Sequence, residues 1–167
     1  MTTLRKNETI ESFSENWSKH LLENHGCDIT VDPHSVDGHH ADLVKHKYGE
    51  NIAILRGYNN NKEIYASSIN GWAGEGWNNN FGNGMNCKNP RSTNNSGECA
   101  HYTTMNWKGL DEIGCGIAKN DTCSIVTCNY RNSNPDPGNS IVGNISSVPN
   151  SGQYATNVVC QEPLSIN

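Results

Sequence analysis

Histidine, cysteine and glutamate are the residues of this chain whose types could do chemistry. The 167 residues include seven His and seven Cys. Four of the histidines share one polar segment: His34, His39, His40 and His46. Neutral imidazoles ligate Zn²⁺ and similar cations, and a metal-activated water could then hydrolyse a substrate. The sequence has no Gly-x-Ser-x-Gly elbow and no cysteine in a catalytic signature, and Ser35 adjoins His34 too closely for a base–nucleophile pair. We therefore predict no catalytic residue.

Composition excludes several classes of function. Only 12 Lys and Arg, a net charge of −5 and no basic cluster argue against nucleic-acid binding. Gly-rich phosphate motifs are absent, and no apolar run approaches the roughly 20 residues of a membrane span. Hydrophobic residues make up 34% of the chain, and Asn and Gly are abundant. We expect a polar, loop-rich domain whose thin core needs covalent cross-links.

The cysteines favour an oxidising compartment, and we expect a secreted, extracellular protein. Five Asn-x-Ser/Thr sequons are candidates for glycosylation: Asn7, Asn16, Asn94, Asn120 and Asn144. The first 13 residues lack the hydrophobic region of a signal peptide. A secreted protein would thus need a signal that is removed or not included in the sequence.

Periodicity predicts the main elements. Ile10, Phe13, Trp17 and Leu21 mark one face of a helix within residues 4–25, capped by Asn7 or Thr9. We expect a short helix near 40–46, a strand within 50–57, a helix over 61–75 capped by Asn61, and a hairpin over 112–130. A long Gly/Asn loop covers 76–98, and residues 131–167 form an extended or coil segment.

Local geometry predicts two disulfides. A hairpin turn near Asp121 and Thr122 sets Cys115 opposite Cys128. The Gly/Asn loop ends at Cys87 and Cys99, which are expected to tether it.

Because seven is odd, at least one cysteine lacks a partner within the chain. We expect Cys160 to be unpaired. It would be either buried beside Val158 and Val159 or bonded to another chain in a covalent dimer; a non-covalent dimer is the other form of self-association we consider.

Several motifs stand in a distinctive order. They are "HS" at 34–35, "YGENIA" at 48–53, "GWAGE" at 71–75, "ECAHYTTMNW" at 98–107, "IGCG" at 113–116 and "VTCNY…PGN" at 126–139. Together they resemble the CAP superfamily, whose SCP domain occurs in cysteine-rich secretory proteins, insect venom allergens and plant pathogenesis-related proteins. The resemblance covers roughly residues 4–140. The family's first helix would lie before residue 4. Three residues differ from the usual sequence motif of the family: Ala100, Thr104 and Asn106.

The resemblance implies an α+β fold, a three-layer α-β-α sandwich with a central, mainly antiparallel sheet and disulfide cross-links. Residues 1–145 would form the CAP/SCP-like domain and residues 146–167 an extended C-terminal tail. It also implies a third disulfide, Cys27–Cys123. Trp72, Tyr102, Trp107 and Tyr130 are expected in the core.

The resemblance further implies a cleft built from His34, Glu50, Glu75 and His101, in which His34 and His101 hold a divalent cation such as Zn²⁺. Sequence alone leaves the first ligand open among four residues: His34, His39, His40 and His46. Sequence alone also allows other roles for the two glutamates. Glu50 could be a structural carboxylate, and Glu75 could be a solvated charge at a helix end.

The favoured function is a secreted binding module that carries a small lipid or sterol, or another small apolar ligand, or engages an extracellular protein. One alternative is a structural or assembly component of an extracellular matrix. A second alternative is a metal-assisted hydrolase.

Overall fold

The computed structural model describes residues 3–75, 100–107 and 109–133, and these form a mixed α/β arrangement. Its strands are β1 (Arg5–Lys6), β2 (Gly49–Leu55), β3 (Glu112–Lys119) and β4 (Ser124–Arg131). Its helices are α1 (Glu8–Asn24), η1 (Val36–Gly38), α2 (His39–His46), α3 (Asn61–Gly74) and α4 (Ala100–Met105).

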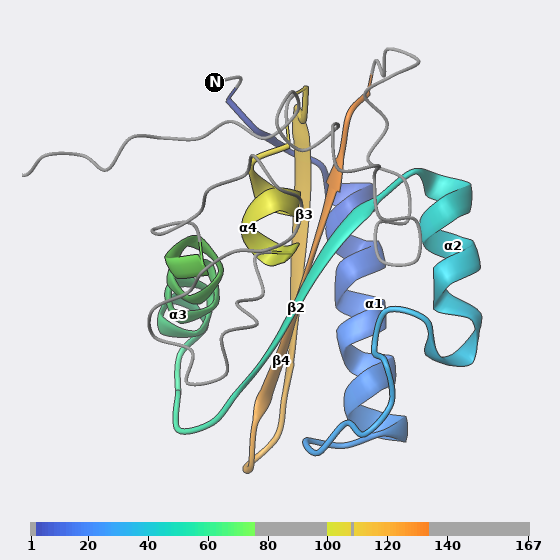
Figure 1. Ribbon diagram of the computed structural model, residues 1–167. Coiled ribbons are helices and arrows are strands. Elements are labelled where there is room, and N and C mark those ends of the chain that lie inside the picture. Colours follow the sequence, from blue (N-terminus) through green and yellow to red (C-terminus); the bar gives the residue numbers. More distant parts are fainter. Residues whose placement is uncertain (1–2, 76–99, 108, 134–167) are drawn as a thin grey trace, which may run out of the picture.

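The four described strands make one mixed sheet in the order β1-β3-β4-β2. The pairs β3–β4 and β2–β4 are antiparallel, and the short β1 is parallel to β3. Helices α1 and α2 lie on one side of this sheet and α3 and α4 on the other (Figure 1). Strand β2 is thus an edge strand of the described sheet, with helices near both of its faces.

The first helix forms where the apolar periodicity predicts it, but it starts later than residue 4 because Arg5 and Lys6 pair with β3 instead. Asn7 is its N-cap: the side-chain Oδ1 accepts the backbone N–H groups of Thr9 at 3.0 Å and Ile10 at 3.2 Å. The helix ends at Asn24, and Gly26 follows with a φ of 70°. This left-handed backbone favours glycine and turns the chain away.

Helix α1 packs unusually closely on β3 through small and polar residues. A Cβ added at Gly114 would lie 2.1 Å from the Glu11 backbone nitrogen, so only glycine fits there. At the same interface the Ser14 hydroxyl lies 2.9 Å from the carbonyl oxygen of Gly114, and one turn further along α1 the Ser18 hydroxyl donates to Thr127 Oγ1 of the neighbouring β4 at 2.9 Å. This polar contact explains how a chain with few apolar residues fills the space between helix and sheet.

Two smaller apolar clusters include Trp17 and Ile10 of α1, and the largest lies on the opposite face, under α3 and α4. The buried members of that cluster are Ile64, Trp72, Tyr102, Trp107, Leu110, Val126, Cys128 and Tyr130. Asn106, which differs from the usual sequence motif of the family, is also buried, and its amide donates to the carbonyl oxygen of Tyr102 at 2.9 Å. The four aromatic residues expected in the core are therefore buried.

The hairpin forms with the expected register, and the two disulfides among the described residues are Cys115–Cys128 and Cys27–Cys123. One predicted detail is wrong: the N-cap of α3 is Asn60, whose side chain accepts the Glu63 N–H at 2.9 Å, not Asn61. Three expectations lie outside the described residues: the Cys87–Cys99 bond, the fate of Cys160 and the tail at 146–167. Within the described part of the chain, no helix is both long and apolar enough to span a bilayer.

Candidate functional site

Glu50 on β2 is the centre of a buried polar network. Its carboxylate lies 3.0 Å from His34 Nδ1 and 2.8 Å from His39 Nε2. Asn129 of β4, the cross-strand neighbour of Glu50, donates its amide to Glu50 Oε2 at 3.0 Å. We call Glu50, His34, His39 and Asn129 the Glu50 network.

Electrostatics favour an ionised Glu50. Burial alone would raise the pKa of this carboxyl, but the hydrogen bonds from His34 and His39 outweigh it and hold the pKa below its ordinary value. The side chain of Glu50 is fully buried, so these bonds replace the water that a carboxylate would otherwise need.

The two histidines on Glu50 occupy different surroundings. The His39 side chain is 2% exposed and stacks flat on Trp17, with ring centroids 3.6 Å apart. The His34 side chain is 14% exposed and lies in the loop before η1. Because a ligand residue must reach solvent or a cation, this difference favours His34 as the ligand and His39 as a structural support.

Ser35 takes no part as a nucleophile in this arrangement. Its hydroxyl donates to Asp32 Oδ2 at 2.8 Å, and Asp32 Oδ1 accepts the backbone N–H of His34 at 3.1 Å. Asp32 therefore fixes the turn that presents His34 to Glu50.

A second histidine–glutamate pair lies at α3 and α4. Glu75 follows the last residue of α3, and its Oε1 lies 2.6 Å from His101 Nδ1. Its other oxygen accepts the backbone N–H of Tyr102 at 3.1 Å, in the first turn of α4. Glu75 is thus a bonded carboxylate that orients His101, not a solvated charge at a helix end.

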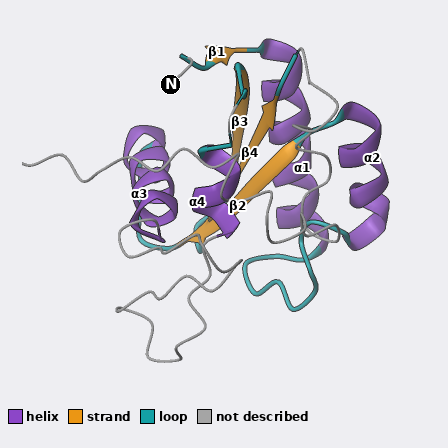
Figure 2. Cartoon of the chain, turned by 45° about the horizontal axis from the view of Figure 1, so that its top comes forward, coloured by secondary structure: helices purple, strands orange, loops and turns teal. Residues whose placement is uncertain are grey.

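The two pairs are attached to neighbouring residues of the edge strand β2. Glu50 binds His34, and the amide of the next residue, Asn51, donates to the carbonyl oxygen of His101 at 3.0 Å. Side chains of successive strand residues point to opposite faces of a sheet, so the two pairs are approached from opposite faces of β2, whose outer edge is unpaired among the described strands. The elements that carry them, the loop before α2 and the helices α3 and α4, lie on the two sides of β2 in Figure 2.

In both pairs a carboxylate oxygen lies within hydrogen-bonding distance of the Nδ1 atom of the imidazole. A neutral ring that donates its Nδ1–H carries its lone pair on Nε2. Carboxylates that hold histidines this way fix the tautomer and raise the basicity of the nitrogen that faces a metal. The donor chemistry of His34 and His101 therefore fits a divalent cation, with Glu50 and Glu75 as supports.

Sequence reasoning missed Asn129 and its connection to α1. The Ser14 hydroxyl donates to Asn129 Oδ1 at 2.7 Å, so the network continues from Glu50 into the helix–sheet interface. Asn129 belongs to the quoted "CNY" motif within the predicted hairpin, which was the available signal, but the pairing of Asn129 with Glu50 between β4 and β2 was not predicted.

The described sequons differ in their surroundings. The amide nitrogen of Asn7 donates to Glu112 Oε1 at 3.2 Å while the same side chain caps α1. Asn120 uses its Oδ1 to accept the N–H groups of Thr122 and Cys123 in the hairpin turn. Asn16 is exposed on α1, and Asn94 and Asn144 lie outside the described residues.

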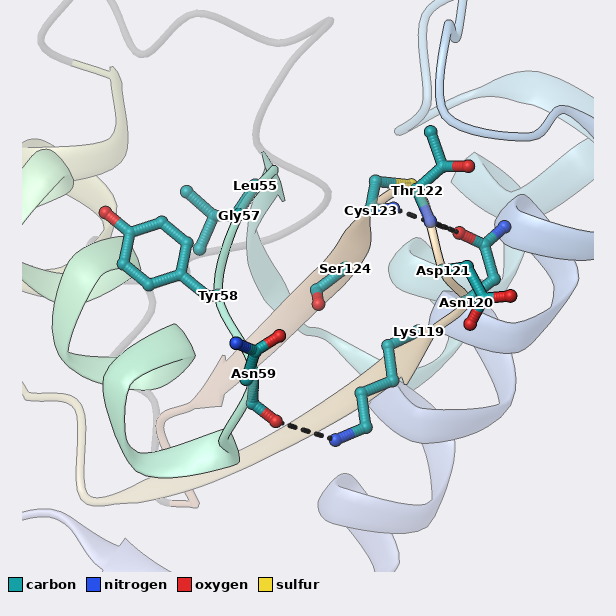
Figure 3. A pocket seen from close by; sticks show the side chains of 10 residues that line it. All are labelled: Leu55, Gly57, Tyr58, Asn59, Lys119, Asn120, Asp121, Thr122, Cys123 and Ser124. Atoms are coloured by element: carbon teal, nitrogen blue, oxygen red, sulfur yellow. Dashed lines mark hydrogen bonds between the residues drawn. The ribbon is translucent and has the colours of Figure 1, made fainter.

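A separate groove lies between the β2–α3 connection and the β3–β4 turn (Figure 3). Its volume is about 410 Å³, and Tyr58, Asn59, Lys119 and Asn120 are among its lining residues. Lys119 donates to the carbonyl oxygen of Asn59 at 3.4 Å across it. This mostly polar lining does not suit a lipid tail.

Several solved structures share this fold. The structure of BmVAL-1 has a TM-score of 0.54 at 20% identity and covers 85% of this chain and 63% of its own. The crystal structure of NaASP2 with Zn²⁺ has a TM-score of 0.53 at 20% identity and covers 85% and 66%. Schistosoma mansoni venom allergen-like protein 4 has a TM-score of 0.51 at 22% identity and covers 78% and 68%. The chain thus spans roughly two thirds of the length of these proteins.

Among curated protein sequences no match to this chain is found. The sequence model of one family, described as the cysteine-rich secretory protein family, matches residues 1–130. That match covers most of the chain and all of the described elements except the last residue of β4. The chain therefore belongs to the CAP family.

Proposed function

We propose that this protein is a secreted CAP-type binding module that holds a divalent cation, such as Zn²⁺, between His34 and His101. The observation that carries the proposal is the pairing of each Nδ1 atom with a carboxylate, Glu50 for His34 and Glu75 for His101. These pairings leave Nε2 of both rings as the nitrogens for a cation. The crystal structure of NaASP2 contains Zn²⁺ in that protein, and this supports the choice of metal.

The same proposal includes the finer architecture and the compartment. Two of the three strand pairs are antiparallel and helices lie on both sides of the sheet, which supports a three-layer α-β-α sandwich with a mainly antiparallel sheet. The two described disulfides support an extracellular location. Binding of a small lipid, sterol or other apolar ligand stays a prediction, as do dimerisation and an extracellular protein partner.

The stability of the fold would not depend on a cation held by only two histidines. Structural zinc sites have four protein ligands, whereas the proposed site has two and is completed by water. Two disulfides already cross-link the described elements, and an apolar core packs them together. Removal of the cation is therefore expected to leave the protein folded.

Zn²⁺ titration calorimetry tests the proposal. We expect His34→Ala and His101→Ala each to lower the affinity of this site at least about tenfold, because each removes a direct ligand. His46→Ala is the matched control, since it removes an exposed imidazole outside both pairs. Unchanged binding in His101→Ala would overturn the site, and unchanged binding in His34→Ala alone would move the first ligand to another histidine.

A further inference from the structure

We propose that His20, His25 and Asp37 form a second site for a transition-metal ion of the Zn²⁺ type, separate from His34 and His101. Nε2 atoms of both rings lie 2.8 Å from the same oxygen, Asp37 Oδ2. The ligand atoms of the three residues all lie within 4.8 Å of one another. Among the described residues this is the one group of three or more His, Cys, Asp or Glu that is so compact. We call it the His/Asp trio.

The backbone of α1 and η1 brings the trio together. His20 lies in the last turns of α1, and His25 is the C-cap with a φ of −121°. Asp37 in η1 has a φ of 54° and a ψ of 24°, a left-handed conformation that is uncommon for residues other than glycine, although Asp and Asn adopt it more readily than most. This backbone aims the carboxylate at the two rings.

His20 is also held from its other side. Its ring stacks on Trp17, with centroids 4.8 Å apart and planes 12° apart. The indole N–H of Trp17 in turn donates to the carbonyl oxygen of Pro33 at 3.1 Å. The amide of Asn24 lies 3.3 Å from His20 Nδ1, and Nε2 of the same ring lies 2.8 Å from Asp37. A ring fixed by stacking loses little freedom when it binds an ion.

Two imidazole nitrogens and one carboxylate oxygen suit Zn²⁺ and related ions better than Mg²⁺ or Ca²⁺, which prefer oxygen ligands. Ligand atoms about 2.0–2.1 Å from a tetrahedral Zn²⁺ are roughly 3.3 Å apart, so each 2.8 Å contact must open slightly. Side chains of the trio are between 21% and 45% exposed. They can make that adjustment, and water can complete the coordination.

The trio also tethers η1 to the end of α1 without any ion, through the two hydrogen bonds to Asp37. Asp37→Asn separates the two roles. Asparagine tolerates the left-handed backbone and keeps an oxygen that accepts from histidine, but it lacks the charge that a cation needs. A tether alone would survive this substitution, whereas a metal site would not.

The experiment titrates Zn²⁺ into the whole chain carrying His101→Ala, so that the proposed site at His34 and His101 is removed. Calorimetry and thermal unfolding are both recorded, because an ion that binds only the folded state raises the unfolding temperature. We expect about one equivalent to bind His101→Ala. In the His101→Ala protein, a further His25→Ala or Asp37→Asn substitution should lower the Zn²⁺ affinity at least about tenfold and abolish the thermal shift. A further His46→Ala substitution should leave both the affinity and the thermal shift unchanged. Mg²⁺ should not bind in its place.

Two results would overturn the second site: no Zn²⁺ binding by folded His101→Ala, or binding that His25→Ala and Asp37→Asn both leave unchanged. Circular dichroism of each variant shows that it is folded. A different pattern is expected if no cation binds at His34 and His101. The unsubstituted protein would then bind one equivalent of Zn²⁺, which His101→Ala would still bind and His25→Ala would not.

Discussion

Asn129 connects the proposed cation site to the interior, because its amide supports Glu50 and its oxygen accepts from Ser14. We predict that Asn129→Ala lowers the free energy of unfolding by about 2 kcal/mol, since it leaves a buried carboxylate without one of its donors. Loosening Glu50 should also lower Zn²⁺ affinity at His34 and His101 by about 10- to 100-fold. Urea denaturation and calorimetry measure the two effects.

Ser14→Ala supplies the comparison for Asn129, because Ser14 contacts Asn129 and not Glu50. In a double-mutant cycle the two substitutions should couple, while Ser14→Ala alone should change Zn²⁺ affinity less. A full loss of affinity in Ser14→Ala, or none in Asn129→Ala, would contradict the supporting role of Asn129.

Asp111 should give the fold an acid-sensitive contact. Burial by itself raises the pKa of this carboxyl, but hydrogen bonds from the Ser133 hydroxyl and N–H and from Arg5 lower it overall. A carboxyl whose pKa is lower in the folded state stabilises that state above its unfolded pKa of about 4, and the contribution is lost as pH falls through the lower value. Asp111→Asn should therefore cost about 1 kcal/mol at pH 7.

The difference between Asp111→Asn and the unsubstituted protein should shrink below about pH 4, where protonation neutralises Asp111 and leaves both proteins without a charge at this position. Urea denaturation at several pH values measures it. Arg5→Ala removes only one of the partners of Asp111 and should give a smaller difference with the same pH dependence. A difference that is constant with pH would show that the carboxylate charge is not responsible.

At the scale of elements, the contact between α1 and β3 depends on two glycines. A Cβ at Gly114 would lie 2.1 Å from the Glu11 nitrogen, and a Cβ at Gly116 would lie 2.2 Å from Glu15. These are backbone atoms, so α1 itself must move. We predict that Gly114→Ala and Gly116→Ala each lower the free energy of unfolding by roughly 3 kcal/mol, measured by urea denaturation.

The matched control for these glycines is Gly71→Ala in α3, where an added Cβ would meet nothing within 4 Å. This substitution should stabilise the protein by up to about 1 kcal/mol, because alanine favours a helix over glycine. Similar losses at Gly71 and Gly114 would mean that helix propensity or chain entropy, and not the close approach of α1, controls the effect.

Elements set by local patterns were predictable from the sequence, and those set by tertiary contacts were not. The apolar face of Ile10, Trp17 and Leu21 and the hairpin around Asp121 each follow from residues near one another in the chain. Strand β1 was missed because two exposed residues, Arg5 and Lys6, carry no periodicity and pair only once β3 exists.

The same reasoning explains what the sequence revealed of the sites. The motif order selected His34, Glu50, Glu75 and His101, and the structure brings them together as two pairs. It did not reveal the His/Asp trio. Five positions along a continuous helix are about 140° apart around the axis, so His20 and His25 do not suggest a shared face. Only the end of α1 at Asn24 turns His25 toward Asp37.

At the scale of the whole molecule, one disulfide joins distant parts of the chain and the other stays within a hairpin. Cys27–Cys123 closes 96 residues and ties the segment after α1 to the start of β4, whereas Cys115–Cys128 closes 13 residues. In the chain-entropy description these loops stabilise the fold by about 4.7 and 2.9 kcal/mol. We therefore predict that Cys27→Ala/Cys123→Ala destabilises the protein by about 2 kcal/mol more than Cys115→Ala/Cys128→Ala.

The two double variants form a matched comparison because each removes one deeply buried cysteine, Cys123 at 3% exposure or Cys128 at 1%. The cavity left behind should therefore add a similar penalty to both. Urea denaturation of the variants, with peptide mapping to show that the other bond remains intact, gives the difference. Equal losses, or a larger loss for Cys115→Ala/Cys128→Ala, would mean that local packing of the hairpin outweighs long-range cross-linking in holding this polar domain together.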